Sequence, residues 1–581
     1  MNTLAGFSAF SVARPAGHEG SGVQLAALRK RNLLQAKLRI LWIALGFVFL
    51  TVIAVMRIGY FGMSDRAITA TSLEDALLPD RGTISDRNGN PLARAFPAYA
   101  LWYNPKAMGE GDSPLVKSPE AVARELKAIF PDLDEAKTAQ RLASGKGGYL
   151  RRRILPEDAN RIQGIGELAL EMPQEDDRHY PQGSMAAHVL GFVGADGKGR
   201  VGMEAVLNEQ LTNPDTRSQP ATLSIDMRVQ GALEDELRRG MKLVDAKGAA
   251  GIVLDVDTGE VMALASLPEF DPNKIDRDGE KFMFNRVTNQ VYELGSTFKP
   301  LSIAAAIDAG VVRDFGKLYD AKPVKVGRFS IKDSHFIGNH LNVPNALIHS
   351  SNTVTARVAD DLGPERLRQT MIDLGMNERP HIELPARGHP IWPSGKWPRL
   401  RNMTVSYGHG VAVTPLHLAG AYAAMVNGGI WRPATLHKLA PGEAPQGRRV
   451  FKESTSSRMR QLLRAIAIYG TGKKADAPGY RVGGKTGSAE KPGKGGYRRT
   501  SLVSTFAAAF PMDRPRYVVI AMLDEPRGTL ASSFQRTASW NAAPIVGRLV
   551  PRIGPMLGVI PDETHDVDIS DLKPLIPEAN R

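Results

Sequence analysis

Gly295-Ser296-Thr297-Phe298-Lys299-Pro300 places a lysine three residues after a serine, at the start of an apolar run. The residues from Leu301 to Ala309 are strong helix formers, and Gly310 ends the run. If the helix begins at Ser296, this spacing puts the hydroxyl and the amine on one face, and Pro300 falls in the first turn, where it is tolerated. Because a desolvated lysine can lose its proton, the stretch predicts a serine nucleophile that works without histidine.

The serine–lysine spacing is not specific by itself, since Ser488-Ala489-Glu490-Lys491 has it too. Two later fragments accompany the first: His349-Ser350-Ser351-Asn352 offers Ser-x-Asn, and Gly484-Lys485-Thr486-Gly487-Ser488 offers Lys-Thr-Gly. Each is common alone. In the order nucleophile, Ser-x-Asn, Lys-Thr-Gly, with a strand at the third, they form a specific set.

The second half of the chain has the pattern of an antiparallel sheet with helices on one face. Strands are expected at 251–256, 260–266, 503–510 and 517–523, the first two joined as a hairpin through Asp257-Thr258-Gly259. Helices are expected at about 228–244 and 537–549. A sheet that carries its first and last helices together belongs to the α+β class.

An apolar segment near the N-terminus is long enough to span a bilayer. No charge interrupts Ile40 to Met56, basic residues precede it, and Arg57 with aromatic residues follows. A cleaved signal peptide would have a shorter apolar run with a small-x-small site after it, so an uncleaved anchor is favoured. The basic flank predicts a cytoplasmic N-terminus, with about 520 residues on the far side.

These patterns divide the chain into five parts. They are a cytoplasmic tail at 1–39, a transmembrane anchor at 40–60, a mixed domain at 61–218, a second domain at 219–562 and a polar tail at 563–581. The mixed domain has a hairpin signal at Asn88-Gly89 and a helical pattern at 118–143. The segment from Ala187 to Gly194 suggests a strand or a tight packing segment, and Met203 to Leu211 suggests a short helix.

Charge and composition exclude some chemistry. The chain has 581 residues, no cysteine and a net charge of +13, of which residues 1–39 contribute six basic and one acidic side chain. Disulfides, thiolate metal sites and cysteine nucleophiles are therefore excluded. The remaining basic excess fits either solubility or attraction to an anionic polymer or surface.

Three other motif matches have plainer explanations. Gly197-x-Gly199-x-x-Gly202 fits a dinucleotide-binding pattern, but no parallel βαβ unit continues it, so a loop is expected. The stretch from Gly479 to Thr486 fits a phosphate-binding loop, but it lacks the strand before and the helix after. His335 and His340 have no evident third metal ligand. We therefore expect no cofactor, no metal and no nucleic acid.

Taken with further motifs, the chain resembles the class B penicillin-binding proteins, and most closely their division-specific, FtsI-type branch. The resemblance covers nearly everything after the anchor. It rests on the three fragments above and on Arg81 to Gly89 with Leu92-Ala93, Arg178-His179-Tyr180-Pro181-x-Gly183, Ala187 to Gly194, Gly202-Met203-Glu204, Tyr407 to Gly410 with Val413 to Leu416, and Asp524-Glu525-Pro526. It implies a membrane helix, an elongated pedestal, and a transpeptidase domain with a five-stranded antiparallel sheet and an all-helical lobe.

The resemblance also implies roles at a peptidoglycan D,D-transpeptidase site. Ser296 would attack the D-Ala-D-Ala bond of a stem peptide, Lys299 would take its proton, and Ser350 would relay a proton to the leaving D-alanine. Asn352 would bond the substrate amide and Lys299. Lys485 and Thr486 would bind the terminal carboxylate, and Gly487 would let the substrate lie along the strand edge. The backbone N–H of Ser488, with that of Ser296, would form the oxyanion hole. An acceptor amine would complete the crosslink, and β-lactams would acylate Ser296. Leu294 stands where the family usually has proline, and Ser488 where threonine is common.

Several functional alternatives stay open. An elongation-specific transpeptidase of the same class is the nearest, although the pedestal around 99–108 and the compact length favour division. A β-lactam sensor or a scaffold with a vestigial site is more remote, and a glycosyltransferase domain has no room in 61–218. The division reading implies an inner-membrane protein with a periplasmic catalytic domain at the septum. Its partners would be an FtsW-type septal glycosyltransferase and other division proteins.

Overall fold

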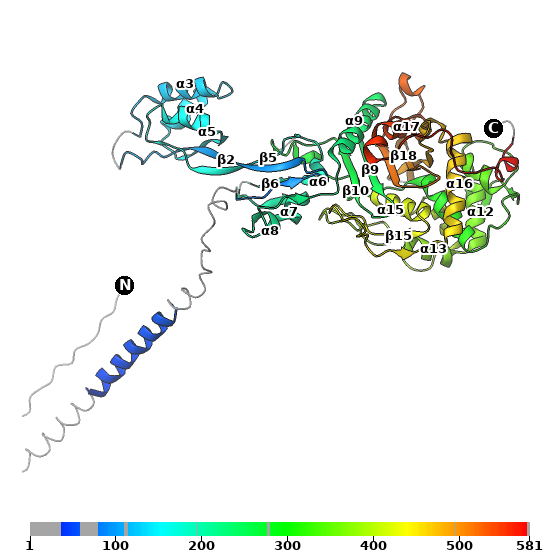
Figure 1. Cartoon of the computed structure of the whole chain (residues 1–581), viewed down its shortest axis with the longest axis horizontal. Helices are drawn as coiled ribbons and strands as arrows, with labels where there is room; N and C mark the ends of the chain where they lie inside the picture. The colour runs from blue at the N-terminus through cyan, green and yellow to red at the C-terminus, as the bar shows by residue number, and fades with distance from the viewer. Residues whose placement is uncertain are drawn as a thin grey trace, which may run out of the picture. The chain divides into compact units, whose positions relative to one another are not determined.

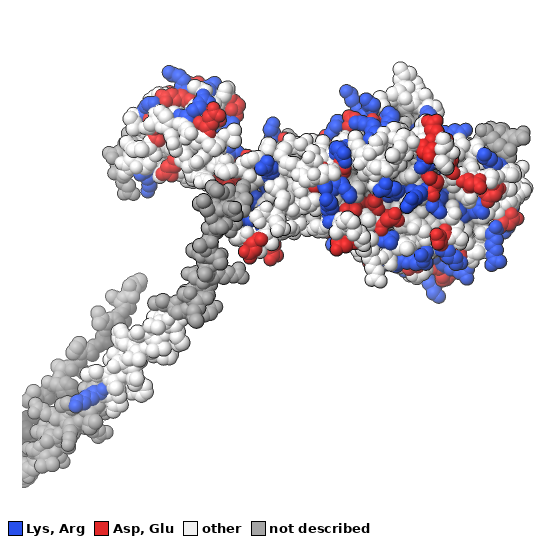
Figure 2. Space-filling view, viewed as in Figure 1, with Lys and Arg blue, Asp and Glu red and all other residues white. Residues whose placement is uncertain are grey.

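The computed structural model describes residues 37–57, 80–109, 114–194, 196–275, 279–493 and 496–577. It forms two compact units, Met1–Leu78 and Pro79–Arg581. In the first, Lys37–Arg57 is a helix of 21 residues that is long and apolar enough to cross a membrane. Figure 2 draws most of this helix white, because charges lie only near its ends. The last three residues of the expected anchor, 58–60, lie outside the described residues.

A five-stranded antiparallel sheet organises the second half of the chain (Figure 1), as expected for an α+β fold. Its strand order is β10-β9-β19-β18-β17. The bounds are β9 Gly248–Asp255, β10 Val261–Leu267, β17 Gly483–Gly493, β18 Gly496–Phe510 and β19 Tyr517–Asp524. The predicted strands are thus confirmed; β9, β18 and β19 are longer than the pattern indicated, and β10 has the predicted length shifted by one residue. β17 is an edge strand, paired on one side only with β18.

Helices cover both faces of this sheet. α9 (Met227–Leu243) and α17 (Ala542–Ile553) pack on each other and on the sheet, and together they enclose one hydrophobic core. α15 (Pro415–Val426) packs against β9, β18 and β19 in the other core. The predicted pair of first and last helices is therefore confirmed. The C-terminal helix starts five residues later than expected, because a 3-10 turn, Ala538–Trp540, precedes it.

A helical lobe continues from the α15 side of the sheet. It contains α10 Lys299–Asp308, α11 Val343–Ile348, α12 Asn352–Leu362, α13 Pro364–Asp373, α14 Arg399–Val405 and α16 Glu453–Tyr469. α10 is its central helix, contacting α12, α13, α15 and α16, and eight of its ten residues are buried. Short strand pairs join these helices: β11 Tyr319–Asp320 with β14 His340–Leu341, β12 Val324–Val326 with β13 Phe329–Ile331, and β15 Ile430–Trp431 with β16 Arg448–Arg449.

The predicted polar tail after residue 562 is wrong for part of its length. Ile569, Leu572 and Ile576 are 5%, 1% and 1% exposed, and all three belong to the large core that contains α10. In the sequence these three residues lie among polar residues, and the apolar pattern is too short to predict a helix. Burial of these three side chains shows that the chain stays packed against the domain almost to its end.

The N-terminal part of the second unit is built on the long strand β2 (Pro91–Tyr103). It pairs with β1 Ile84–Ser85, β3 Gly148–Ile154, β4 Leu170–Glu171 and β5 Gln174–His179, while β1 also pairs with β8 Ala221–Thr222. The predicted turn at Asn88-Gly89 joins β1 to β2, with Gly89 at φ +86°. Three short helices complete the far end: α3 Pro119–Ile129, α4 Glu135–Ala143 and α5 Pro156–Gln163.

Two local predictions in this region need correction. The single helical pattern at 118–143 is two helices, because Asp134 caps a new helix with its side chain. The segment 187–194 is a short helix, α6 Ala187–Leu190, followed by β6 Phe192–Val193. β6 forms a hairpin with β7 Gly199–Val201, so the glycine pattern near 197 lies in a turn as expected. The predicted helix at 203–211 is α7 Gly202–Val206 followed by α8 Asn208–Thr212.

A buried ion cluster ties these short elements together. Glu204 in α7 is fully buried and accepts hydrogen bonds from Arg81 Nε at 2.8 Å and Arg178 Nε at 2.7 Å. Both arginines are themselves at most 6% exposed, and Arg178 also donates to the Gly82 carbonyl. One carboxylate is therefore shared by two buried guanidinium groups, one from β5 and one from the segment before β1.

We expect Glu204→Gln to destabilise this region by about 3–5 kcal/mol, because it leaves two buried guanidinium groups without a counter-charge. Urea unfolding of the full-length protein in detergent, followed by circular dichroism, measures the loss. The control is Glu125→Gln, whose pair with Lys117 is about 40% exposed on both sides and should cost about 1 kcal/mol or less. Equal losses for the two variants would contradict the role of the cluster.

Candidate active site

The turn that carries Ser296 precedes the α-helix instead of belonging to it. Gly295–Phe298 forms a 3-10 turn, η2, and the α-helix begins at Lys299, three residues later than the sequence suggested. A 3-10 turn aligns residues three apart, so Ser296 and Lys299 still lie on one side, and the Lys299 N–H donates to the Ser296 carbonyl. Ser296 is half-buried, whereas Lys299 is fully buried.

Ser350 is the residue at which the other two fragments meet. It lies between α11 and α12 in a left-handed conformation, φ 61°, which non-glycine residues seldom adopt. The Lys299 Nζ atom donates to its Oγ at 3.0 Å, and the Lys485 Nζ atom donates to the same oxygen at 2.9 Å. Lys299 Nζ also contacts the Ser350 carbonyl oxygen. Residues from three distant segments thus converge on one hydroxyl.

The edge strand β17 presents the Lys-Thr-Gly fragment beside the nucleophile turn. Lys485 is fully buried and donates to Thr486 Oγ1 at 3.2 Å, while Thr486 donates to Thr471 Oγ1 at 2.7 Å. Gly487 has no room for a side chain, because a Cβ there would stand 2.5 Å from the Leu294 carbonyl oxygen. The glycine therefore allows β17 to lie directly against η2. Since a strand continues through Gly484-Lys485-Thr486, the phosphate-loop alternative is excluded.

The side chain of Asn352 is placed differently from expectation, whereas the side-chain bond of Ser488 is compatible with the backbone role expected of it. Asn352 begins α12, and its side-chain amide donates to the Lys332 carbonyl at 3.1 Å, so the expected Asn352–Lys299 bond is not formed among the described residues. The hydroxyl of Ser488 accepts a hydrogen bond from the Ala538 N–H at 3.0 Å. This bond ties the Ser488 side chain to the chain after β19, which leaves its main chain as the part available at the strand.

Asp333, which was not among the predicted site residues, organises the Ser-x-Asn turn. Its carboxylate accepts bonds from Ser351 Oγ at 2.8 Å, the Asn352 N–H at 2.5 Å, and both the N–H and the Oγ1 of Thr353 at 3.0 Å. A carboxylate at the start of α12 also interacts favourably with the helix dipole. No local pattern marks this aspartate, because its partners lie about 20 residues later in the chain.

Burial lowers the pKa of both lysines. Desolvation lowers the pKa of Lys299 well below its ordinary value, the neighbouring Lys485 lowers it further, and Asp333 opposes the shift. Desolvation alone lowers the pKa of Lys485 to about 7. Both shifts favour the uncharged amines, and a pKa of about 7 lets Lys485 gain or lose its proton near neutral pH.

A groove of about 310 Å³ lies next to the nucleophile turn. Glu293, Gly410, Glu490 and Lys491 are among its lining residues. Glu293 accepts bonds from the Gly410 N–H at 3.0 Å and from the Tyr497 hydroxyl at 3.3 Å, and burial raises its pKa. The 407–410 segment was predicted as a family motif, whereas Glu293 and Tyr497 were not among the predicted site residues.

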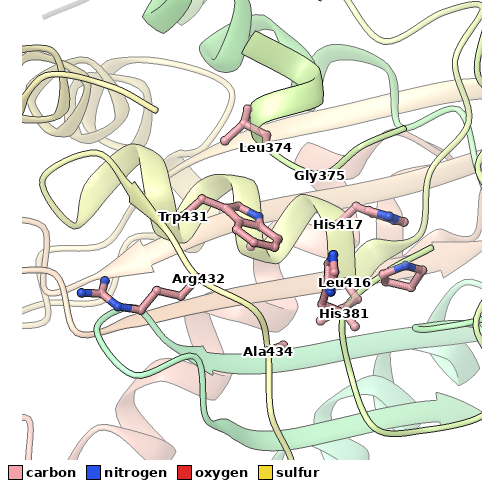
Figure 3. A pocket seen from close by; sticks show the side chains of 10 residues that line it. Leu374, Gly375, His381, Leu416, His417, Trp431, Arg432 and Ala434 are labelled. Carbon is pink, nitrogen blue, oxygen red and sulfur yellow. The ribbon is translucent and has the colours of Figure 1, made fainter. Parts of the chain in front are cut away.

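A second, smaller cavity has a structural explanation. His381, His417 and Trp431 line a cavity of about 20 Å³ that includes none of the predicted site residues (Figure 3). His417 bonds Thr414 at the start of α15 and the Glu378 carbonyl at 2.8 Å, and burial lowers its pKa to about 4. A neutral histidine that caps a helix and bridges two segments accounts for this cluster.

Family models match most of the chain. One described as "Penicillin binding protein transpeptidase domain" matches residues 249–550, and one described as "Penicillin-binding Protein dimerisation domain" matches residues 76–219. The transpeptidase match includes all three fragments that meet at Ser350.

Curated relatives and solved structures agree with these matches. The "Probable peptidoglycan D,D-transpeptidase FtsI" of Caulobacter vibrioides is 38% identical over 525 residues, covering 88% of this chain and 87% of that protein. The PenA protein of Neisseria gonorrhoeae is 33% identical, covering 78% and 81%. The structure of penicillin binding protein 3 from Mycobacterium tuberculosis with ampicillin has a TM-score of 0.66 at 24% identity, covering 85% and 99%, which supports the fold.

We expect Asp333→Asn to cost about 1–3 kcal/mol of stability, because the substitution weakens four hydrogen bonds and removes a charge from the start of α12. Urea unfolding of the full-length protein measures it. Asp360→Asn is the matched control in the same helix, since its bonds to Arg399 are at the surface. A smaller loss for Asp333→Asn than for the control would contradict the organising role.

Proposed function

The chain belongs to the penicillin-binding protein transpeptidase family, and on this premise we propose that it is a division-type peptidoglycan D,D-transpeptidase that acts through an acyl-serine. The observation that carries the proposal is the meeting of Lys299 and Lys485 at the Ser350 hydroxyl, one turn from the half-buried Ser296. Two lysines with lowered pKa and the hydroxyl that they share, all beside a nucleophile, supply acid, base and anion binding in one place.

The first half-reaction forms the acyl-enzyme. Ser296 Oγ attacks the carbonyl carbon between the two terminal D-alanines, and the neutral Lys299 amine accepts the hydroxyl proton. The backbone N–H groups of Ser296 and Ser488 stabilise the oxyanion of the tetrahedral intermediate. The peptide C–N bond then breaks, and the proton reaches the departing D-alanine nitrogen by way of Ser350. An ester between Ser296 and the stem peptide remains.

The second half-reaction forms the crosslink. An amine from a neighbouring stem peptide attacks the ester carbonyl and loses a proton, a new amide bond forms, and Ser296 leaves with a proton returned through Lys299. Lys299 and Ser350 therefore transfer protons in both directions, with Ser350 taking the proton that the acceptor amine loses. Asn352 bonds the backbone of the substrate after a change of its side-chain orientation, because its amide donates to Lys332 in the free protein.

β17 and the groove beside it bind the donor peptide. Lys485 and Thr486 bind the terminal carboxylate, a natural partner for an ammonium group beside a hydroxyl. Gly487 lets the peptide lie along the edge strand, whose outer side is unpaired in the sheet. The groove lined by Glu293, Gly410 and Glu490 takes the part of the stem peptide that precedes the D-alanines.

β-Lactams occupy the same site, since their strained amide presents a carbonyl and a carboxylate at similar spacing. Attack by Ser296 opens the ring, but the leaving nitrogen stays attached to the acyl group. Among the described residues, the site has no carboxylate hydrogen-bonded to Ser296 that would activate water for deacylation. The adduct is therefore long-lived.

The membrane helix Lys37–Arg57 sets where this chemistry occurs. The protein is a single-pass membrane protein, with its N-terminus in the cytoplasm and its catalytic domain in the periplasm, following the basic residues that precede the helix. A lone helix that includes Ala44 and Gly46 offers close packing to a polytopic partner such as an FtsW-type septal glycosyltransferase. The 61–218 domain receives signals from other division proteins.

Ser296→Ala should abolish covalent labelling by benzylpenicillin, because no other group offers a nucleophile at this position. Intact-mass spectrometry and peptide mapping of the full-length protein in detergent test this, with one persistent adduct on the Ser296 peptide expected for the unaltered chain. Ser302→Ala is the control, since its buried hydroxyl bonds the Ser406 carbonyl away from the site. Stoichiometric labelling of Ser296→Ala would refute the nucleophile assignment.

The acylation efficiency should fall as pH rises above about 7. The pKa of Lys485 is lowered to about 7, so the fraction of protonated Lys485 able to attract the carboxylate decreases through this range. Second-order acylation rates from pH 5.5 to 9.5 measure the alkaline limb. Lys485→Arg should react more slowly but lose this limb, because a guanidinium stays charged. An unchanged limb in Lys485→Arg would assign the titration to another group.

A further inference from the structure

The end of the chain makes specific polar contacts with the two elements that deliver Ser350 and Lys485. We call residues 566–576 the C-terminal strap. Its buried side chains Ile569, Leu572 and Ile576 anchor it in the main core. Its polar groups reach α16 and α11, which themselves pack on each other. The strap therefore has both a fixed position and defined attachment points.

The first attachment runs through Arg464 to the strand that carries Lys485. Asp566 in the strap accepts bonds from Arg464 Nε at 2.9 Å and from Nη2 at 2.7 Å. The remaining nitrogen, Nη1, donates to the Val482 carbonyl at 2.9 Å, immediately before β17, and to Asp476 at 2.7 Å. Arg464 is only 7% exposed and its bond to the Val482 carbonyl is buried, whereas the Asp566 carboxylate lies at the surface. Its guanidinium orientation depends on Asp566.

The second attachment runs through two asparagines to the helix that precedes Ser350. The Leu575 carbonyl in the strap accepts bonds from Asn342 Nδ2 at 2.9 Å and from Asn345 Nδ2 at 2.7 Å. Asn342 is also the N-cap of α11, since its side chain accepts from the Asn345 N–H at 2.9 Å. α11 is six residues long and ends two residues before Ser350. One carbonyl of the strap thus holds both asparagines at the start of this helix.

We propose that the C-terminal strap is a positioning element of the active site, with Asp566 and the Leu575 carbonyl holding β17 and α11 so that Lys485 and Ser350 meet. The inference rests on the proposed acyl-transfer function. Lys485 and Ser350 lie 135 residues apart in the chain, so packing alone must hold the 2.9 Å contact between Lys485 Nζ and Ser350 Oγ. Displacement of catalytic groups by about 1 Å costs about 100-fold in rate.

A neighbouring ion pair in the strap provides a matched control. Asp571 accepts a bond from Arg458 Nη1 at 2.5 Å, also between the strap and α16. Arg458 lies about two turns before Arg464, and its described contacts do not reach β17. Loss of this pair loosens the strap at the surface without altering the bond from Arg464 to Val482.

The test compares Asp566→Asn, Asp566→Glu, Asn345→Ala and Asp571→Asn in the full-length protein in detergent. Acylation by benzylpenicillin is followed by stopped-flow fluorescence to separate the acylation rate constant from the half-saturating concentration, and thermal unfolding is recorded in parallel. We expect Asp566→Asn and Asn345→Ala to lower the rate constant about 5–50-fold. Asp566→Glu should recover part of this loss, and Asp571→Asn should stay within about twofold of the unaltered protein.

The pH dependence of acylation adds a readout that a purely structural role would not move. A loosened β17 admits water to Lys485, so its pKa should rise, and the alkaline limb should move to higher pH in Asp566→Asn but not in Asp571→Asn. Unchanged rate constants and limb in Asp566→Asn, or equal losses in Asp571→Asn, would overturn the proposal.

Further outcomes distinguish failure of the strap proposal from failure of the proposed function. If Asp566→Asn fails to fold, Asn345→Ala decides by the same criteria, because it alters the other attachment. If the unaltered protein itself forms no adduct on Ser296, the proposed function fails, and the positioning role fails with it. Normal acylation in every variant would remove only the strap proposal.

Discussion

Two buried lysine side chains that share one half-buried serine hydroxyl impose the constraint on which the rest of the domain depends. Ammonium groups are strongly destabilised in a water-poor interior, and two of them within reach of the same oxygen destabilise each other further. This cost appears as a lowered pKa for both lysines, which favours their uncharged amines. An uncharged amine can act as a base. The lowered pKa that reduces the cost of burying the lysines therefore also provides the proton acceptor that the site needs.

Holding this arrangement requires close approach of main chains as well as placement of side chains. Three glycines allow the nucleophile turn to lie between β17 and the segment around 408: Gly295, Gly408 and Gly487. A Cβ at Gly408 would stand 2.2 Å from the Gly295 carbonyl oxygen, and one at Gly487 would stand 2.5 Å from that of Leu294. Side chains elsewhere can adjust to a neighbour, but a backbone carbonyl in a packed turn cannot, so Gly408 and Gly487 admit no larger residue, while Gly295 supplies a left-handed turn with φ +55°.

Particular residues show how far sequence patterns reach. The strand pattern predicted the hairpin of β9 and β10 and the pair β18 and β19 within a few residues, because apolar runs bounded by turns are local signals. The start of α10 was predicted three residues early, since propensity does not distinguish a 3-10 turn from the first turn of an α-helix. The strap was predicted as a polar tail, because four apolar residues spread over eight positions give a weak signal that only their packing reveals.

The sequence by itself determined the membrane segment, the fold class, the family resemblance and the identity of the serines and lysines in the three fragments. These properties follow from the order of residues along the chain, which local patterns record directly. Only the tertiary structure decided that Ser350 is the meeting point, that Asp333 organises its turn, and that Asn352 faces Lys332 in the free protein. Each of these facts depends on bonds between residues brought together by packing. Their partners lie from about 20 to more than 100 residues away, and no spacing rule connects positions so far apart.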